Sequence, residues 1–311
     1  MRPTARLAAA ALALVTTTAL AGPNDIDVSR LGNPSRSGTA VNAVPGANGS
    51  FRIMARELGA AISAANLMPP DTLGHSAFSV NLELSVVSMD GRQPPGPGEA
   101  PLSEGFALPT ERPFQGPLLM PSIHVRKGLP FSLELGGRVA WFEKSAMYAG
   151  TAELKWAPLE GFSALPDVGV RLHGSRLFNT RDFTVATGGL DLGLGKTFPI
   201  GGMVTLTPYA GYDLSFTGAN SAILDFDPAR TRPDRDSAAD RLNPDVAGAY
   251  ESVRFFQNPA SRFYAGVRFV GGVIQLGLEV SATTFGGFDD ETGRRQIPTV
   301  GAFNSTLGLT F

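Results

Sequence analysis

His173 and Ser175 are the residues of this sequence whose types and spacing best suit catalysis. Side chains two positions apart on a β-strand point to the same face, so an imidazole there can take the hydroxyl proton and create a nucleophile. In the alternating pattern around them, both residues fall on the same strand face as Arg171, and the apolar Val170 and Leu172 fall on the opposite face. We therefore expect the pair to belong to a polar network, with nucleophilic catalysis as the alternative.

Composition excludes several other kinds of chemistry. The 311 residues include no Cys and three His, and no H-x-x-H or H-E-x-x-H spacing occurs, so neither a thiolate site nor a metal site is indicated. The formal net charge of −2 argues against nucleic-acid binding, which needs clustered Lys and Arg. We predict no catalytic residues, no metal, no cofactor and no nucleic-acid partner, and hence a protein that is not an enzyme.

The first 21 residues have the pattern of a secretory signal peptide. Arg2 and Arg6 give a positive start, an apolar run follows over 7–20, and Ala19-Leu20-Ala21 is a cleavage site of the A-x-A type. The run is too short for a membrane-spanning helix, which takes about 20 apolar residues. We expect residues 1–21 to be removed on export.

The rest of the chain is dominated by apolar–polar alternation. At the start of the first such segment, Phe78, Val80 and Leu82 alternate with Ser79 and Asn81. A period of two indicates strands with one apolar and one polar face. The alternation continues beyond the ~5–6 residues of an average strand and suits the ~9–11 residues of a tilted bilayer crossing. Ten segments are predicted, at 76–88, 118–127, 131–142, 146–157, 167–178, 182–196, 202–216, 260–270, 272–284 and 301–311.

The connections between these segments alternate in length. The three longest, 89–117, 217–259 and 285–300, belong to one alternate set, whereas the other set contains short Gly- and Pro-rich turns such as 128–130. Membrane barrels show this asymmetry, with long loops outside and short turns in the periplasm. The sequence thus predicts an all-β fold: an antiparallel transmembrane β-barrel of about 10 strands, with 8 or 12 as alternatives, and a short N-terminal helix.

Each predicted strand has one face for lipid and one for the lumen. The outward face carries almost no charge, as expected where a Lys or Arg costs about 2–4 kcal/mol at the bilayer midplane. The aromatic girdle predicted on this face consists of Phe131, Trp141, Tyr148, Trp156, Phe216, Phe263, Phe269 and Phe311. The polar network predicted in the lumen consists of Glu83, His124, Arg126, Glu134, Arg138, Glu153, Lys155, Arg171, His173, Asp191, Asp213, Arg268 and Glu279. Because about eight strands are just filled by their own side chains, we expect these balanced charges to keep a slightly larger lumen closed or narrow.

The chain before the first strand forms a separate region. Residues 22–49 are rich in Gly, Asn, Ser and Pro and predict a periplasmic tail. Between Phe51 and Ala65 apolar residues recur with helical spacing, with Ser50 as the expected N-cap. This helix either plugs the barrel or lies on the periplasmic membrane surface. The predicted organisation is a signal peptide at 1–21, a tail and helix at 22–74, and a barrel at 75–311.

The last residues carry the most specific local signal, which is predicted to direct assembly. Phe303, Leu307, Leu309 and the terminal Phe311 lie on one face of the final strand. A closing strand of this kind resembles those of the outer-membrane β-barrel proteins of Gram-negative bacteria, including porin-like small barrels. In that superfamily the last strand is recognised by the barrel-assembly machinery. The resemblance therefore implies an outer-membrane location, that machinery as a partner during biogenesis, and contact with membrane lipid and lipopolysaccharide.

Three functional hypotheses follow. The first is a structural or interaction barrel, or a narrow pathway for small solutes, whose lumen is largely filled by charged side chains. The second is a channel or transporter for a small or hydrophobic ligand, gated by the N-terminal helix. The third is an outer-membrane lipid hydrolase, because the spacing of His173 and Ser175 resembles that of membrane-embedded phospholipases and lipid A deacylases. In those enzymes the pair faces the lipid, whereas the parity here points to the lumen.

Overall fold

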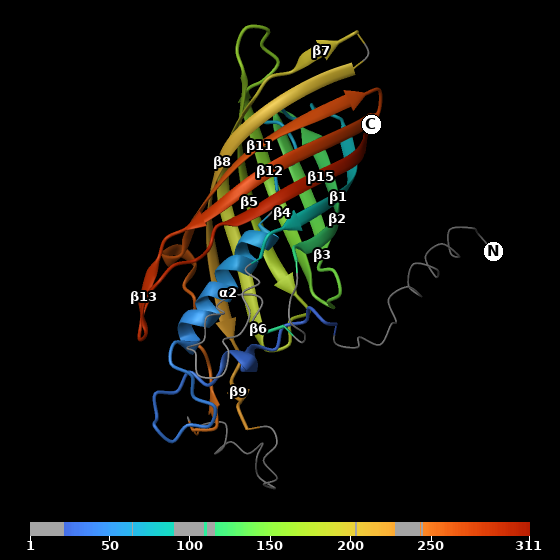
Figure 1. Cartoon of the computed structure of the whole chain (residues 1–311). Helices are drawn as coiled ribbons and strands as arrows, with labels where there is room; N and C mark the ends of the chain where they lie inside the picture. The colour runs from blue at the N-terminus through green and yellow to red at the C-terminus, as the bar shows by residue number, and fades with distance from the viewer. Residues whose placement is uncertain are drawn as a thin grey trace, which may run out of the picture.

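Ten long antiparallel strands close into a barrel in the computed structural model (Figure 1). They follow the order β1-β2-β3-β4-β5-β6-β8-β11-β12-β15, and β15 pairs with β1 to complete the ring. Their bounds are β1 Phe78–Val87, β2 Leu118–Leu129, β3 Leu133–Trp141, β4 Tyr148–Leu159, β5 Asp167–Phe178, β6 Phe183–Gly195, β8 Val204–Ser221, β11 Pro259–Gly271, β12 Ile274–Phe285 and β15 Val300–Thr310. Each overlaps one predicted segment, so the predicted all-β barrel is confirmed.

Shorter elements extend the two ends of the barrel. They are η1 Val28–Leu31, α2 Ala47–Ile62, β7 Phe198–Ile200, β9 Leu224–Asp225, β10 Ala247–Gly248, η2 Phe255–Gln257, β13 Phe288–Asp290 and β14 Gly293–Arg295. The structure describes residues 22–63, 65–89, 109–110, 116–202, 204–227, 243 and 245–311, so the predicted signal peptide at 1–21 lies outside the described residues. None of the helices in these ranges is long and apolar enough to cross a membrane.

The two ends of the barrel differ in their connections. The hairpins β2–β3, β4–β5, β6–β8 and β11–β12 turn at one end, where the C-terminus also lies, and we call this the turn end. The connections β1–β2, β3–β4, β5–β6, β8–β11 and β12–β15 lie at the other end, which we call the loop end. Figure 1 shows α2, β9 and β13 together at the loop end, far from the C-terminus.

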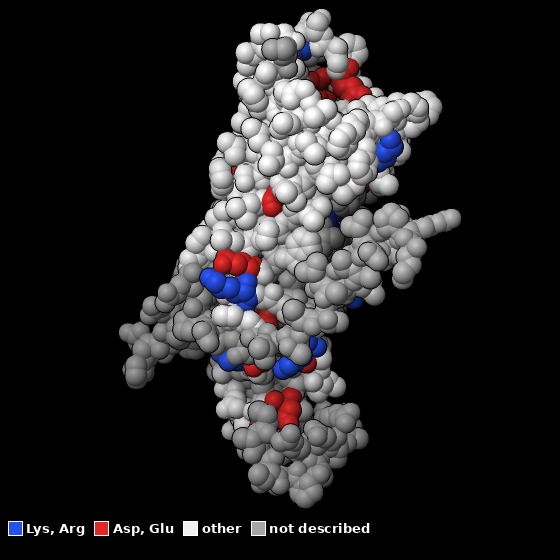
Figure 2. All heavy atoms as spheres, turned by 90° about the vertical axis from the view of Figure 1, so that its right-hand side faces the viewer, with Lys and Arg blue, Asp and Glu red and all other residues white. Residues whose placement is uncertain are grey.

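The outer wall is apolar between two aromatic zones. Leu172, Leu190 and Leu307 are each more than half exposed, which is unfavourable in water and favourable in lipid. Most Lys, Arg, Asp and Glu on the face shown in Figure 2 lie towards the two ends. Tyr148 and Trp156 stand at opposite ends of β4, about 26 Å apart along the strand at about 3.3 Å per residue. At a strand tilt of about 40° this separation spans about 20 Å of height, most of the ~25 Å apolar band of outer-membrane barrels.

The predicted aromatic girdle residues divide between these zones. Phe131, Trp156, Phe269 and Phe311 lie near the turn end, whereas Trp141, Tyr148 and Phe216 lie near the loop end. Phe263 is exposed on β11 and packs against Tyr212, with ring centroids 5.1 Å apart. Phe216 is covered on the outside by Phe255 and Phe256 of η2, whose rings lie 6.2 and 5.7 Å away.

The N-terminal region runs through the barrel. Helix α2 begins after Gly46, which has a left-handed φ of 82° that a glycine adopts without strain, and not after Ser50, so the predicted N-cap is wrong. The helix ends at Ile62, and residues 65–77, which we call the lumen thread, lead from it to β1 at the turn end. Residues 22–46 therefore lie at the loop end. The sequence predicted a periplasmic tail and external long loops. In this structure the tail and the long loops lie at the same end of the barrel, so the two predictions cannot both hold.

Candidate functional site: the filled lumen

The loop-end half of the lumen is apolar and holds α2. Inward residues there include Leu118, Phe142 and Val185, all buried, and they form one cluster with Phe51 and Leu58 of the helix. Nearly every residue of α2 is buried, as expected for a helix surrounded by protein rather than lying on a surface. Fully burying a large apolar side chain contributes about 1.5–3 kcal/mol, so the helix is held mainly by this packing.

A glycine sets how closely α2 approaches the barrel wall. Gly59 faces Thr217 of β8, and a Cβ atom on Gly59 would lie 3.0 Å from the Thr217 Cβ and closer still to its Oγ1 and Cγ2. Any larger residue at this position would therefore push the helix away from β8.

The turn-end half of the lumen contains a continuous network of ion pairs. Glu153 on β4 is its centre, because it accepts from Arg171 Nη1 at 2.8 Å, from Arg126 Nε at 3.0 Å and lies 2.9 Å from His124 Nε2. Around the ring, Glu83 pairs with Arg138 at 3.1 Å. Further pairs join Arg171 to Asp191 at 2.8 Å, Lys155 to Glu134 at 3.1 Å and His173 to Asp213 at 2.9 Å.

Every residue of the predicted lumen network is buried in this half of the barrel. Two of them have no ion pair with another wall strand among the described contacts: Arg268 pairs with Asp71 of the lumen thread at 2.6 Å, and Glu279 accepts from the backbone N–H of Leu67 at 2.8 Å. The charges therefore bind the N-terminal region as well as each other, so side chains of the wall alone do not fill the lumen.

Arg262 was not among the predicted lumen residues, although it points to the same face of β11 as Arg268. Its guanidinium donates to the carbonyls of Ala60 at 2.8 Å and Ser63 at 3.1 Å, and so satisfies carbonyls at the C-terminal end of α2. Counting inward positions back from Arg268 would have found it. Asp71 was missed because nothing in its local sequence indicates that it enters a barrel.

His173 and Ser175 both face the lumen and are buried. The imidazole Nε2 of His173 lies 2.9 Å from Asp213 Oδ1, whereas the hydroxyl of Ser175 lies 2.8 Å from that of Thr151. The two side chains thus engage different partners, and neither reaches the lipid. The geometry does not assemble the lipid-facing pair on which the hydrolase hypothesis depends.

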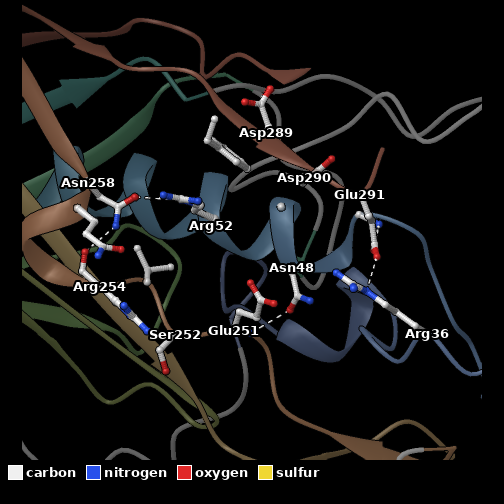
Figure 3. Close-up of a pocket in the computed structure, with 15 residues that line it drawn as sticks. Arg36, Asn48, Arg52, Glu251, Ser252, Arg254, Asn258, Asp289, Asp290 and Glu291 are labelled. Atoms are coloured by element: carbon white, nitrogen blue, oxygen red, sulfur yellow. Dashed lines mark hydrogen bonds and ion pairs between the residues drawn. The ribbon is translucent and has the colours of Figure 1, made fainter. Parts of the chain in front are cut away.

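A polar cavity of about 760 Å³ opens at the loop end beside the start of α2 (Figure 3). Arg52 of α2 reaches across it to Asn258, with a 3.0 Å hydrogen bond, and Arg36 pairs with Glu291 at 3.0 Å on the opposite side. Burial lowers the pKa of Arg52, which lies over the ring of Phe288 at 4.6 Å. Within the described residues, no cluster of three or more potential metal-ligating side chains occurs.

The β13–β14 hairpin contacts the start of α2. Glu291 Oε1 accepts from the backbone N–H of Gly46 at 2.6 Å, and Asp290 lies against Gly49 while pairing with Arg295 at 2.7 Å. These carboxylates lie at the helix end where the dipole favours negative charge. The cavity therefore lies beside the N-terminal end of α2, where acidic residues of the chain itself already contact the helix.

No protein-family model and no curated protein matches the chain. Among solved structures, Neisserial surface protein A is similar at 11% identity, over 76% of this chain and 100% of that one, with a TM-score of 0.29. The outer membrane protease OmpT from Escherichia coli is similar at 8% identity, over 76% and 93%, with a TM-score of 0.34. The β domain of the Bordetella autotransporter BrkA is similar at 10% identity, over 76% and 100%, with a TM-score of 0.37.

These similar structures are β-barrels of Gram-negative outer membranes. They include a protease and proteins of other kinds, so they do not distinguish an enzyme from a non-enzymatic barrel. Because all three TM-scores are below 0.5, the assignment of the fold rests on this chain's own strand pairing. The chain is a closed antiparallel β-barrel of ten long strands, with its own N-terminal region inside.

Proposed function

We propose that this protein is a non-enzymatic structural or interaction barrel of the Gram-negative outer membrane, closed by its own N-terminal region. The observation that carries the proposal is the double filling of the lumen: α2 packs into the apolar half, and the lumen thread is hydrogen-bonded by the charged half. Breaking such buried charge contacts is costly, so a steadily open pore is disfavoured. The loop-end cavity is the proposed place for an external partner.

Planar-bilayer recording tests the closure. The full-length protein should show little or no steady conductance. Deleting residues 22–70 removes α2 and half of the lumen thread, and this variant should conduct. Deleting only residues 22–45 is the matched control, because it leaves α2 in place, and this variant should stay closed. A large, stable conductance from the full-length protein would reject the proposal.

The second candidate is a pathway gated by α2. It is favoured by the way α2 is held: by apolar packing against the barrel, by the β13–β14 hairpin, and by hydrogen bonds with Arg262 and Asn258, all of which can break and re-form. In that case the full-length protein should open transiently when a ligand or a membrane voltage is applied. Complete silence under both conditions, together with conduction after deletion of 22–70, would favour the first candidate.

A further inference from the structure

We infer that the charged half of the lumen is a binding site for non-helical polypeptide, occupied by the chain's own lumen thread, and that the barrel thereby delivers residues 22–46 to the external surface. The inference rests on the proposed function and on the orientation that the long loops predict, with the loop end outside. It adds an activity, the passage and display of an N-terminal segment, to a barrel proposed so far only as structural.

The wall recognises the backbone of the thread by its hydrogen-bonding groups. Carboxylates accept from backbone N–H groups: Glu279 from Leu67 at 2.8 Å, and Glu134 from Leu73 at 3.0 Å. Cations donate to backbone carbonyls: Arg126 to Asn66 at 2.6 Å. Lys155 donates likewise to Asp71 at 2.9 Å. A buried backbone group needs such a partner, and here charged side chains provide it.

The thread is enclosed by strands on several sides. Its backbone contacts residues of β2, β3, β4 and β12, and Asp71 pairs with β11. Pro70 lies against β5 and β6, where glycines leave room: a Cβ on Gly169 would lie 3.0 Å from the Cβ of Pro70, and one on Gly193 would lie 3.5 Å from it. Because these wall positions have no side chain, they leave space for the lumen thread.

The thread connects the two ends of the barrel. At the turn end, Thr72 bonds to Glu160 of the β4–β5 connection, with its backbone N–H 2.8 Å from a carboxylate oxygen. At the loop end, Asn24 donates to the carbonyl of Glu143 at 2.7 Å and Asn42 to that of Phe226 at 2.8 Å. Residues 22–46 therefore lie on the same side as the long loops, although β1 begins on the other side.

Cysteine labelling on intact cells tests the delivery, because the native chain has no Cys. Gly38→Cys reports on the N-terminal segment and Gly286→Cys on the β12–β13 connection at the loop end; a Cβ at either position meets no atom within 4 Å. Ser163→Cys, at an exposed position of the β4–β5 turn, reports on the turn end. The probe is a membrane-impermeant polyethylene-glycol maleimide, and heat-modifiable migration checks that each variant is folded.

We expect Gly38→Cys and Gly286→Cys to be labelled on intact cells, and Ser163→Cys only after the outer membrane is permeabilised. Labelling of Gly286→Cys without Gly38→Cys would overturn the delivery while leaving the proposed barrel intact. Labelling of Ser163→Cys alone would instead reject the proposed orientation, and with it the external display. Protection of all three positions on intact cells would mean that neither end of the barrel is exposed at the surface. That result would reject both the proposed orientation and the delivery of residues 22–46.

A disulfide tests occupancy of the lumen site directly. In Pro70→Cys/Gly193→Cys the two Cβ atoms would be 3.5 Å apart, within the range that a disulfide needs. We expect both thiols to be blocked without reductant and two maleimides to add after reduction. The control pair is Gly38→Cys/Gly193→Cys, whose members lie at opposite ends and should stay reduced. Two free thiols in folded Pro70→Cys/Gly193→Cys would show that the thread is not bound there and would overturn the inference.

Discussion

Asp71 of the lumen thread and Arg268 of β11 form a 2.6 Å ion pair between the N-terminal region and the barrel wall. The pair shows that the charges inside this barrel are not balanced by opposite walls alone. Where wall and thread carry complementary charges, each lowers the free-energy cost of burying the other in the lumen, because an unpaired buried charge is costly. The thread is thus part of the barrel's interior structure.

Arg171→Ala should destabilise the barrel strongly. Arg171 pairs with both Glu153 and Asp191, so its removal leaves two buried carboxylates short of a partner, at a cost of about 3–5 kcal/mol, less if water enters. Arg176→Ala on the same strand is the matched control, because Arg176 faces outward and is exposed. Thermal unfolding followed by heat-modifiable migration measures both. Equal losses in the two variants would contradict the importance of the buried pairs.

Gly59→Ala should displace α2 and raise the bilayer conductance, because its Cβ would collide with the side chain of Thr217. Thr217→Ala removes the two colliding atoms, Oγ1 and Cγ2, and should restore closure when combined with Gly59→Ala. Single-channel recording of the two single variants and the double variant measures the effect. If Gly59→Ala is as silent as the native protein, helix packing against β8 does not control the pore.

Glu291→Gln should loosen the start of α2 by about 0.5–2 kcal/mol, because Glu291 bonds to the Gly46 N–H and lies at the positive end of the helix dipole. Asp289→Asn is the control, since its 3.6 Å pair with Arg294 is well exposed and contributes about 0–1 kcal/mol. Amide hydrogen exchange in the first turn of α2 should quicken in Glu291→Gln only. Unchanged protection there would mean that the hairpin does not stabilise the helix.

Deleting Phe311 should reduce insertion into the outer membrane. Its backbone exchanges two 2.9 Å hydrogen bonds with Phe78 and so completes the seam between β15 and β1. Phe311→Asp keeps these bonds but places a charge near lipid, and should reduce insertion less than the deletion. Ile223→Asp, at an exposed position beyond the end of β8, is the control and should insert normally. Normal amounts of heat-modifiable protein after the deletion would contradict the predicted assembly signal.

The strands were predictable because lipid imposes a strict alternation. Leu172 must point outward, so Arg171 and His173 must point inward, and this parity holds along the whole ring. The same constraint made the lumen network and the outward aromatic residues identifiable without any contact information. The short strands β9, β10, β13 and β14 carry no such alternation, since they lie beyond the lipid, and they were not predicted.

The sequence predicted a lumen largely filled by charged side chains and left open whether the helix plugs the barrel, because periodicity gives the direction of a side chain and not its partner. A signal was nevertheless present: the inward positions Leu118, Leu177 and Val185 near the loop end are apolar, unlike the inward charges further along the same strands. An apolar lumen surface requires an apolar occupant. The helix predicted from Phe51 to Ala65 was the available candidate. Its position at the loop end could not be inferred from the sequence, because it depends on the route that residues 65–77 take through the lumen.

The closed ring around the lumen thread has a consequence for the order of biogenesis. The ring is completed when β15 meets β1, and residues 65–77 then lie inside a continuous loop of hydrogen-bonded backbone. A helix about 10 Å wide would have to break the buried ion pairs to pass afterwards. We therefore expect the N-terminal region to enter while the seam between β15 and β1 is still apart, so that the pairing of β15 with β1 determines when this region becomes trapped.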